Sequence, residues 1–316
     1  MARVLVTRRM PPGSLDPLLD AGHELVGPPR DDRPMSAAEL RIAAADVDAV
    51  VCLLTDRIDR SVVEVGRGRV RVIANVAVGV DNIDVAAAAE AGIAVCNTPG
   101  VLDEATADLA FLLILAASRR TTEAEADLRA GRWAGWNIND HLGQDVHGRR
   151  LGVVGWGRIG RVVATRAAGF GMTVRHHARR PTGDEGFVAD LDDLLRWADV
   201  VSLHVPLGPE SHHLVDARRL GLMKATSVLV NTSRGPVVDE AALAAALHAG
   251  TIFAAGLDVF EDEPAVHPEL VRAPGAVLLP HIGSATVRTR TAMGRLAAES
   301  VVDLLAGRTP ATVVAP

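Results

Sequence analysis

The chain has 316 residues and a formal net charge of −6, with 48% hydrophobic and 23% charged residues. This composition excludes general disorder and fibrous repeats, and the acidic balance argues against nucleic acid or an anionic membrane as the main partner. The strongly apolar stretch at residues 109–117 is shorter than the roughly 20 residues that a membrane span requires. With no secretory pattern at the N-terminus, we expect a cytoplasmic protein of two domains.

Cysteine, lysine and tyrosine counts limit the chemistry further. Cys52 and Cys96 each end an apolar run, and we expect both in the core because two cysteines make no disulfide framework. Lys224 is the only lysine, and tyrosine is absent. These counts exclude a P-loop lysine, a Schiff-base lysine elsewhere in the chain and every tyrosine-dependent mechanism.

The first hundred residues alternate short β-branched runs with Ala/Leu-rich segments of helical period, which is typical of βαβ units around a parallel sheet. The expected strands cover residues 3–7, 23–27, 49–54, 70–76 and 93–97. The expected helices cover residues 14–21, 36–45 and 84–91. This region can form a complete small α/β domain.

A break at residues 97–100 precedes a long predicted helix. Asp103 and Glu104 lie in its first turn and Arg119 and Arg120 at its end, where these charges complement the helix dipole. Its centre, residues 109–115, is apolar nearly all the way round and should be buried on several sides. Trp133 and Trp136 follow in a polar stretch, and we favour an interface role over a core role for both.

A second alternating series begins at Leu151 and predicts a second α/β sheet. Its further strands are expected at residues 172–177, 200–205, 228–232, 252–259 and 277–280. The last predicted helix, residues 285–306, has no strand after it. We therefore expect it to pack back on the first domain.

The clearest motif is a G-x-G-x-x-G turn between a strand and a helical segment. Gly155 permits the tight turn, Gly157 lets the backbone approach a pyrophosphate, and Gly160 lets helix and strand pack closely. Free N–H groups at the helix start, including those of Arg158 and Ile159, then face the phosphates. This context predicts a dinucleotide site.

The strand after that turn lacks the acid that usually binds the adenosine ribose of NAD. It ends in His177, Arg179 and Arg180, and the first acid is Asp184. Because arginines form charge-assisted hydrogen bonds with a 2′-phosphate, we predict NADP(H) over NAD(H), with Arg179 as the principal contact. The alternative is that the arginines form a solvated pair and NAD is bound through the backbone.

Histidine pairs at 176–177 and 212–213 invite a metal interpretation. Adjacent residues on a strand point to opposite faces, so neither pair makes a compact bidentate site, and no Cys/His spacing supports one. We predict no metal site.

Three later segments place polar residues at the ends of apolar strands, where α/β sheets gather their ligands. They are residues 230–235, 256–264 and 279–284. Beside a nicotinamide, an arginine fork can hold the carboxylate of a 2-oxo acid, and a histidine can give its carbonyl a proton. A neighbouring carboxylate favours the protonated form of such a histidine.

With these segments the chain resembles the D-isomer-specific 2-hydroxyacid dehydrogenase family over nearly its whole length. The markers are residues 155–160, 231–235, 258–264 and 280–284. The resemblance implies Arg234 as the substrate-binding arginine, His281 as the acid/base and Glu263 as its paired carboxylate. It also implies Asp258 and Thr232 near the nicotinamide, and the backbone of Val78 and Gly79 on the substrate carboxylate. Further candidates are Leu54 for the substrate and Thr106, Pro206 and Gly283 for the cofactor.

The resemblance further implies a flavodoxin-like substrate domain with a parallel sheet, from residues 1–99 plus 286–316. Residues 100–285 would form a Rossmann cofactor domain, also with a parallel sheet. Dimers of the family form through the cofactor domains, so we expect a homodimer.

Residues 97–102 and 105–108 resemble the glyoxylate/hydroxypyruvate reductase branch, and residues 176–181 resemble its NADP-preferring members. The leading hypothesis is therefore an NADPH-dependent reductase of glyoxylate or hydroxypyruvate that forms D-2-hydroxy acids. A 2-ketogluconate or other sugar-acid reductase is the alternative among enzymes. A nucleotide-sensing, corepressor-like binding protein is the alternative of another class.

Overall fold

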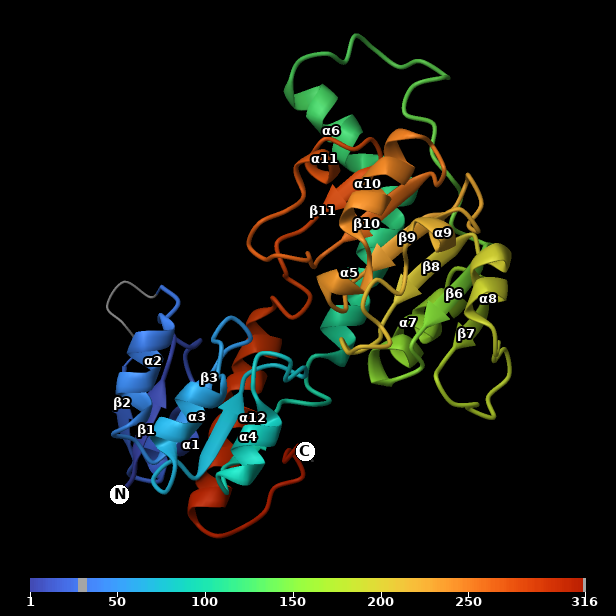
Figure 1. Ribbon diagram of the computed structural model, residues 1–316. Helices are drawn as coiled ribbons and strands as arrows, with labels where there is room; N and C mark the ends of the chain where they lie inside the picture. The colour runs from blue at the N-terminus through green and yellow to red at the C-terminus, as the bar shows by residue number, and fades with distance from the viewer. Residues whose placement is uncertain (28–32, 315–316) are drawn as a thin grey trace. The chain divides into compact units, whose positions relative to one another are not determined.

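The computed structural model describes residues 1–27 and 33–314. The chain divides into two compact units (Figure 1). Unit 1 comprises Met1–Leu102 and Ser284–Pro316, and unit 2 comprises Asp103–Gly283. Among the described helices, none is long and apolar enough to cross a membrane.

Unit 1 is a parallel five-stranded sheet with helices on both faces. Its strands are β1 (Arg3–Val6), β2 (Glu24–Val26), β3 (Ala49–Cys52), β4 (Val72–Asn75) and β5 (Ala94–Cys96). Its helices are α1 (Asp16–Asp20), α2 (Ala37–Ala44), α3 (Arg60–Gly66), α4 (Val85–Glu90) and α12 (Val287–Leu305). The strand order β2-β1-β3-β4-β5 is that of a flavodoxin-like fold.

Helices α2, α3 and α4 share a hydrophobic cluster with buried residues of the strands. Helix α12 packs against α1, β3 and β4. The strands β3 and β4 are buried at every position. Cys52 and Cys96 are both buried and unpaired, as predicted. Continuous apolar strands of this kind are expected where helices cover both faces of a parallel sheet.

Unit 2 is a parallel six-stranded sheet. Its strands are β6 (Arg150–Val154), β7 (Thr173–His177), β8 (Val200–Leu203), β9 (Val228–Asn231), β10 (Ala254–Leu257) and β11 (Ala276–Leu278). Its helices are α5 (Asp103–Ser118), α6 (Thr121–Arg129), α7 (Arg158–Ala168), α8 (Leu191–Trp197), α9 (Ala217–Leu220), α10 (Glu240–His248) and α11 (Pro268–Val271), with a 3₁₀ turn, η1 (Gly235–Val237).

The strand order in unit 2 is β11-β10-β9-β8-β6-β7. The direction of winding reverses at β6, so the crevice at the carboxyl ends of β6 and β8 is where a doubly wound sheet binds its ligand. One face of the sheet packs on α5 and α7, and the other packs on α8, α9, α10 and α11. The predicted α/β class with two parallel sheets is confirmed.

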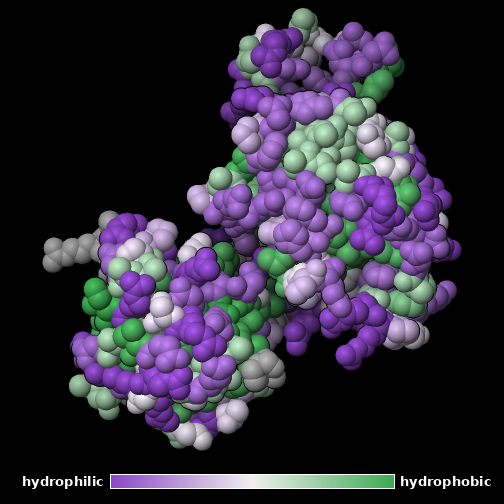
Figure 2. Space-filling view, viewed as in Figure 1, coloured by the Kyte–Doolittle hydropathy of each residue, from purple (hydrophilic) through white to green (hydrophobic). Residues whose placement is uncertain are grey.

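The segment after α5 differs from the sequence prediction. The helix ends at Ser118 rather than at Arg120, because Arg120 adopts a left-handed conformation (φ 52°) and starts the separate helix α6. No residue of α6 is buried. Trp133 and Trp136 after it are 61% and 81% exposed, so neither belongs to the core of this chain. Figure 2 shows apolar residues among hydrophilic ones where Figure 1 places this segment.

Candidate active site

The chemically interesting side chains of unit 2 gather at the carboxyl edge of its sheet. Arg234 follows β9, Asp258 follows β10, and His281 follows β11. The Gly155 turn follows β6 at the same edge. Parallel strands bring their carboxyl ends together, which explains why residues far apart in the sequence meet here.

His281 and Glu263 form a direct pair. Nδ1 of His281 lies 2.8 Å from Oε2 of Glu263, and the two side chains are 26% and 30% exposed. Oε1 of Glu263 also accepts the backbone N–H of Phe260 at 3.1 Å. Burial opposes ionisation of Glu263, but the hydrogen bond and charge of His281 outweigh it and lower the pKa of Glu263. The pair therefore has an ionised carboxylate at neutral pH.

The backbone of His281 is in the left-handed conformation, with φ at 53°, which residues other than glycine rarely adopt. Its N–H donates to the carbonyl of Asp258 at 2.9 Å, which ties the end of β11 to the end of β10. Left-handed backbone at a non-glycine residue is strained and persists where the surroundings enforce it. Here it aims the imidazole at Glu263.

Arg234 lies on a loop that Asn231 closes. The amide nitrogen of Asn231 donates to the carbonyl of Arg234 at 2.9 Å, and its oxygen accepts from the backbone and hydroxyl of Ser233. Gly235 is required next, because a Cβ there would lie 1.8 Å from the backbone of Phe260. The charge of Arg234 reaches Glu263 and contributes to lowering its pKa. Asn231 and Gly235 both stand in the motif block 231–235, but neither has a predicted role of its own.

Asp258 orients the turn after His281. Its two oxygens accept the backbone N–H groups of Ile282 and Gly283, each at 2.7 Å. Burial raises the pKa of Asp258, and these two hydrogen bonds partly offset the effect. A Cβ on Gly283 would lie 3.2 Å from Oδ2 of Asp258 and 3.5 Å from Thr106. Asp258, Gly283 and Thr106 are thus neighbours at the carboxyl edge.

The glycine-rich turn has the geometry that a pyrophosphate requires. Gly155 has φ of 98°, and a Cβ there would lie 2.4 Å from the carbonyl oxygen of His204. A Cβ on Gly160 would lie 2.2 Å from the carbonyl oxygen of Gly155, so α7 packs tightly against the turn. Among the described residues, no atom lies within 4 Å of a Cβ on Gly157 and no side chain caps α7, which begins at Arg158 and Ile159. The helix start can therefore accept an anion.

Thr232 provides a second observation that fits a bound dinucleotide. Its Oγ1 is buried and has no hydrogen-bond partner within the described residues. Buried polar groups are nearly always paired, so an unpaired one beside the sheet's carboxyl edge fits a ligand contact. Pro206, after β8, lies at the same edge.

The end of β7 places its two histidines on opposite sides. His176 is buried and stacks on Trp156, whereas Nδ1 of His177 lies 3.0 Å from the carbonyl oxygen of Val188. Arg179 pairs with Glu210 at 3.5 Å, and both side chains are more than three-quarters exposed. Arg180 is also exposed.

The remaining predicted substrate residues belong to unit 1. Leu54 follows β3, and Val78 and Gly79 follow β4. The side chain of Asn97 donates to the carbonyl of Val78, and that of Asn75 donates to the carbonyl of Gly79, each at 2.8 Å. These bonds fix the peptide orientation of the loop after β4.

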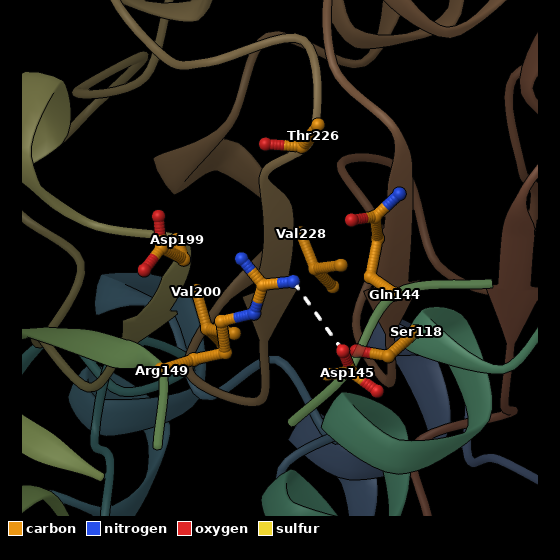
Figure 3. Close-up of a pocket in the computed structure, with 8 residues that line it drawn as sticks. All are labelled: Ser118, Gln144, Asp145, Arg149, Asp199, Val200, Thr226 and Val228. Carbon is orange, nitrogen blue, oxygen red and sulfur yellow. Dashed lines mark ion pairs between the residues drawn. The ribbon is translucent and has the colours of Figure 1, made fainter. Parts of the chain in front are cut away.

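A further pocket of unit 2 lies at the opposite edge of the sheet (Figure 3). It is lined by residues that precede or begin strands, among them Arg149, Asp199 and Thr226. Arg149 pairs there with Asp145 at 3.7 Å. Because this pocket lies at the amino ends of β6, β8 and β9, it is separate from the site described above.

The model of the D-isomer-specific 2-hydroxyacid dehydrogenase NAD-binding domain matches residues 111–283. The chain belongs to this dehydrogenase family. A glyoxylate reductase from Thermococcus onnurineus is 43% identical over 99% of this chain and 95% of its own length. The crystal structure of the TT0316 protein from Thermus thermophilus matches with a TM-score of 0.93 and 45% identity, over 99% of this chain and all of that one.

A third relative was solved with bound ligands. The NADPH-dependent glyoxylate/hydroxypyruvate reductase SmGhrB from Sinorhizobium meliloti, in complex with NADP and malonate, has a TM-score of 0.85 and 35% identity. The match covers 99% of this chain and 96% of that one. The family resemblance drawn from the sequence is confirmed, and the chain is an NAD(P)-dependent 2-hydroxyacid dehydrogenase.

Proposed function

We propose that this dehydrogenase is an NADPH-preferring reductase of small 2-oxo acids, with glyoxylate and hydroxypyruvate as its first candidates, and that it forms D-2-hydroxy acids. The observation that carries the proposal is the His281–Glu263 pair with Arg234 nearby, at the sheet edge that also holds the Gly155 turn. The similarity to glyoxylate reductases over almost the full chain supports the substrate class.

In this proposal His281 is the acid that protonates the substrate carbonyl. The bound dinucleotide supplies a hydride to the carbonyl carbon. Glu263 holds Nδ1 of His281, so Nε2 is the ring nitrogen that gives the proton to the oxygen. Ionised Glu263 stabilises the imidazolium before transfer and orients the ring during it. In the oxidative direction His281 takes the proton back.

Arg234 is assigned to the substrate carboxylate. A guanidinium can hold a carboxylate through two parallel hydrogen bonds, which fixes both its position and its orientation. In unit 1, the backbone N–H groups of Val78 and Gly79 are proposed to bind substrate, with Leu54 as a further substrate residue. The carbonyls of Val78 and Gly79 already accept from Asn97 and Asn75.

The proposed cofactor preference rests on charge at the end of β7. Asp184 is the first acid after β7, and its Oδ2 already accepts from Trp156 and pairs with Arg161. The charged groups that precede it are Arg179 and Arg180, which suit a 2′-phosphate. A 2′-phosphate would compete with Glu210 for Arg179. The NADP complex of SmGhrB supports this assignment.

The proposal also covers the roles of the two units and the oligomeric state. We infer that unit 2 binds the dinucleotide and that unit 1 is the substrate domain. The exposed apolar residues after α6 suit an interface between two cofactor domains. They are Trp133, Trp136, Ile138 and Leu142. A homodimer is expected by light scattering, and a monomer with unchanged turnover would remove this segment from the account.

The decisive test is the oxidation of NADPH and NADH by purified protein with glyoxylate, hydroxypyruvate and 2-ketogluconate. We expect a higher kcat/KM with NADPH than with NADH, and a higher kcat/KM with the two small acids than with 2-ketogluconate. Equal kcat/KM with both cofactors would overturn the cofactor preference alone. Binding of NADPH without turnover of any acid would overturn the reductase and favour a nucleotide-sensing protein.

A further inference from the structure

The loop that carries Arg179 and Arg180, residues 178–186, is tied back to strand β7. The N–H of His176 donates to the carbonyl of Gly186 at 2.9 Å, and the N–H of Val188 donates to the carbonyl of His176 at 2.8 Å. These bonds pair the far end of the loop with β7. Both ends of the loop are therefore held at the end of β7.

The second half of this loop is anchored by Asp184. Its Oδ2 accepts the indole N–H of Trp156 at 2.6 Å and lies 2.8 Å from Nη2 of Arg161. Its own N–H donates to Thr182, whose hydroxyl lies 2.7 Å from Nε2 of His176. The hydrogen bond from Trp156 is the main cause that lowers the pKa of Asp184, so its carboxylate is ionised at neutral pH. The contacts join the loop to the start of α7.

Trp156 occupies the variable position between Gly155 and Gly157, in the turn that receives the pyrophosphate. Its ring stacks on the buried ring of His176, with 3.8 Å between centroids and 13° between planes. The guanidinium of Arg161 lies 5.2 Å from the indole centroid. One side chain thus contacts β7, α7 and the loop. The G-x-G-x-x-G pattern places no such demand on this position.

We infer that Trp156 and Asp184 are positioning residues that lock loop 178–186 to the phosphate-binding turn and so hold Arg179 and Arg180 ready for the 2′-phosphate of NADP. The inference rests on the proposed cofactor preference. Arg179 and Arg180 are exposed, long side chains, so their affinity for a phosphate depends on how well their backbone is ordered before binding. Trp156 supplies that order from the turn that holds the neighbouring pyrophosphate.

Binding of 2′,5′-ADP and of 5′-AMP, measured by calorimetry on the full-length protein, tests this inference without turnover. The variants are Asp184→Ala, which removes the anchor, and Trp156→Phe, which keeps an aromatic ring but removes the indole N–H. We expect the Kd for 2′,5′-ADP to rise about tenfold in Asp184→Ala and less in Trp156→Phe, with the Kd for 5′-AMP changed less than about twofold. Asp193→Asn, which removes an exposed acid that pairs with Arg196, is the control.

Hydrogen–deuterium exchange supplies a second readout. Residues 178–187 should exchange faster in Asp184→Ala, while β6 and α7 keep wild-type protection. Unchanged exchange in this segment, or an equal loss of both nucleotides, overturns the inference. If the wild type binds 2′,5′-ADP no better than 5′-AMP, the NADP preference fails instead, and the exchange result alone decides whether Asp184 anchors the loop.

Discussion

The two edges of the six-stranded sheet in unit 2 use charged residues in opposite ways. At the amino edge, Asp199 accepts from the backbone and side chain of Arg150 and pairs with Lys224 at 2.6 Å. Lys224 also donates to the carbonyl of Trp197. The side chain of Asp199 is only 13% exposed. Burial opposes its ionisation, but these bonds prevail and hold the pKa of Asp199 far below its usual range.

At the carboxyl edge the carboxylate of Glu263 accepts fewer hydrogen bonds, one from the backbone of Phe260 and one from His281. The side chains of His281 and Glu263 remain more than a quarter exposed, and His281 stands on left-handed backbone. Strain and partial exposure are tolerated where a group must exchange a proton with a substrate. On the proposed function, the ion pairs at the amino edge serve stability, whereas the His281–Glu263 pair at the carboxyl edge serves chemistry. Substitutions at the two edges should therefore affect different measurements.

The largest effect is expected for His281→Ala. Loss of the general acid should lower kcat for glyoxylate reduction about 10³-fold, since general acid–base catalysis contributes roughly 10²–10⁴-fold. The Kd for NADPH, measured by fluorescence titration, should stay within about twofold of the wild type because the proposed role of His281 is on the substrate. Loss of NADPH binding together with turnover would place His281 in the cofactor pocket.

Glu263→Gln should lower kcat/KM on the order of 10²-fold, because the amide keeps the shape but not the charge that stabilises the imidazolium. The lowered pKa of Glu263 gives the sign of the pH effect. Ionised Glu263 supports the pair at neutral pH, and that support is lost as pH falls through its folded pKa. The wild-type advantage over Glu263→Gln should therefore persist from pH 8 to about pH 5 and shrink in more acidic buffer, as measured by kcat/KM from pH 3 to pH 8. A pH-independent ratio would contradict this role.

Arg234→Ala should raise the KM for glyoxylate and lower kcat/KM about 10- to 100-fold, which corresponds to the loss of a charge-assisted hydrogen-bonded contact. Arg234→Lys is the matched variant, since it keeps the charge without the planar fork and should recover only part of the loss. Steady-state kinetics with saturating NADPH measure both. An unchanged KM in Arg234→Ala would remove the arginine from the substrate site.

The smallest effect on catalysis is expected at the amino edge. Asp199→Asn should leave kcat/KM near the wild-type value but lower the free energy of unfolding by about 1–3 kcal/mol at pH 7. Because the folded pKa of Asp199 is lowered, its stabilisation is present above the ordinary carboxyl pKa and is lost as pH falls. The stability difference from the wild type should therefore shrink in acid, as followed by urea unfolding. A large loss of kcat at full stability would break the contrast between the edges.

The sequence predicted the repeating pattern of unit 2 better than its side-chain contacts. Each strand expected from Leu151 onward has a counterpart, because most of these strands are short buried apolar runs, as parallel strands covered on both faces tend to be. Helix α6 was missed, since no residue in it is buried and it has no apolar stripe. The stacking of Trp156 on His176 was also out of reach, because it joins side chains from two elements whose spacing carries no periodic signal.

For the site, the motif blocks predicted segments that the structure brings to one edge of the sheet, but they did not predict the contacts of each residue there. The close approach of Gly235 to Phe260 and the left-handed backbone of His281 are properties of the assembled edge. Local sequence patterns predict which strands end in a polar residue. They do not predict the contacts between the loops that follow two different strands.

Whether His281 and Glu263 act as one acid–base unit can be measured from the kcat/KM of the double variant His281→Ala/Glu263→Gln for glyoxylate reduction. Residues that act as a unit have non-additive effects. We expect the double variant to be no slower than His281→Ala alone, because Glu263 has no imidazole to support once His281 is replaced. Losses that multiply, with Glu263→Gln slowing the alanine variant as much as it slows the wild type, would contradict it.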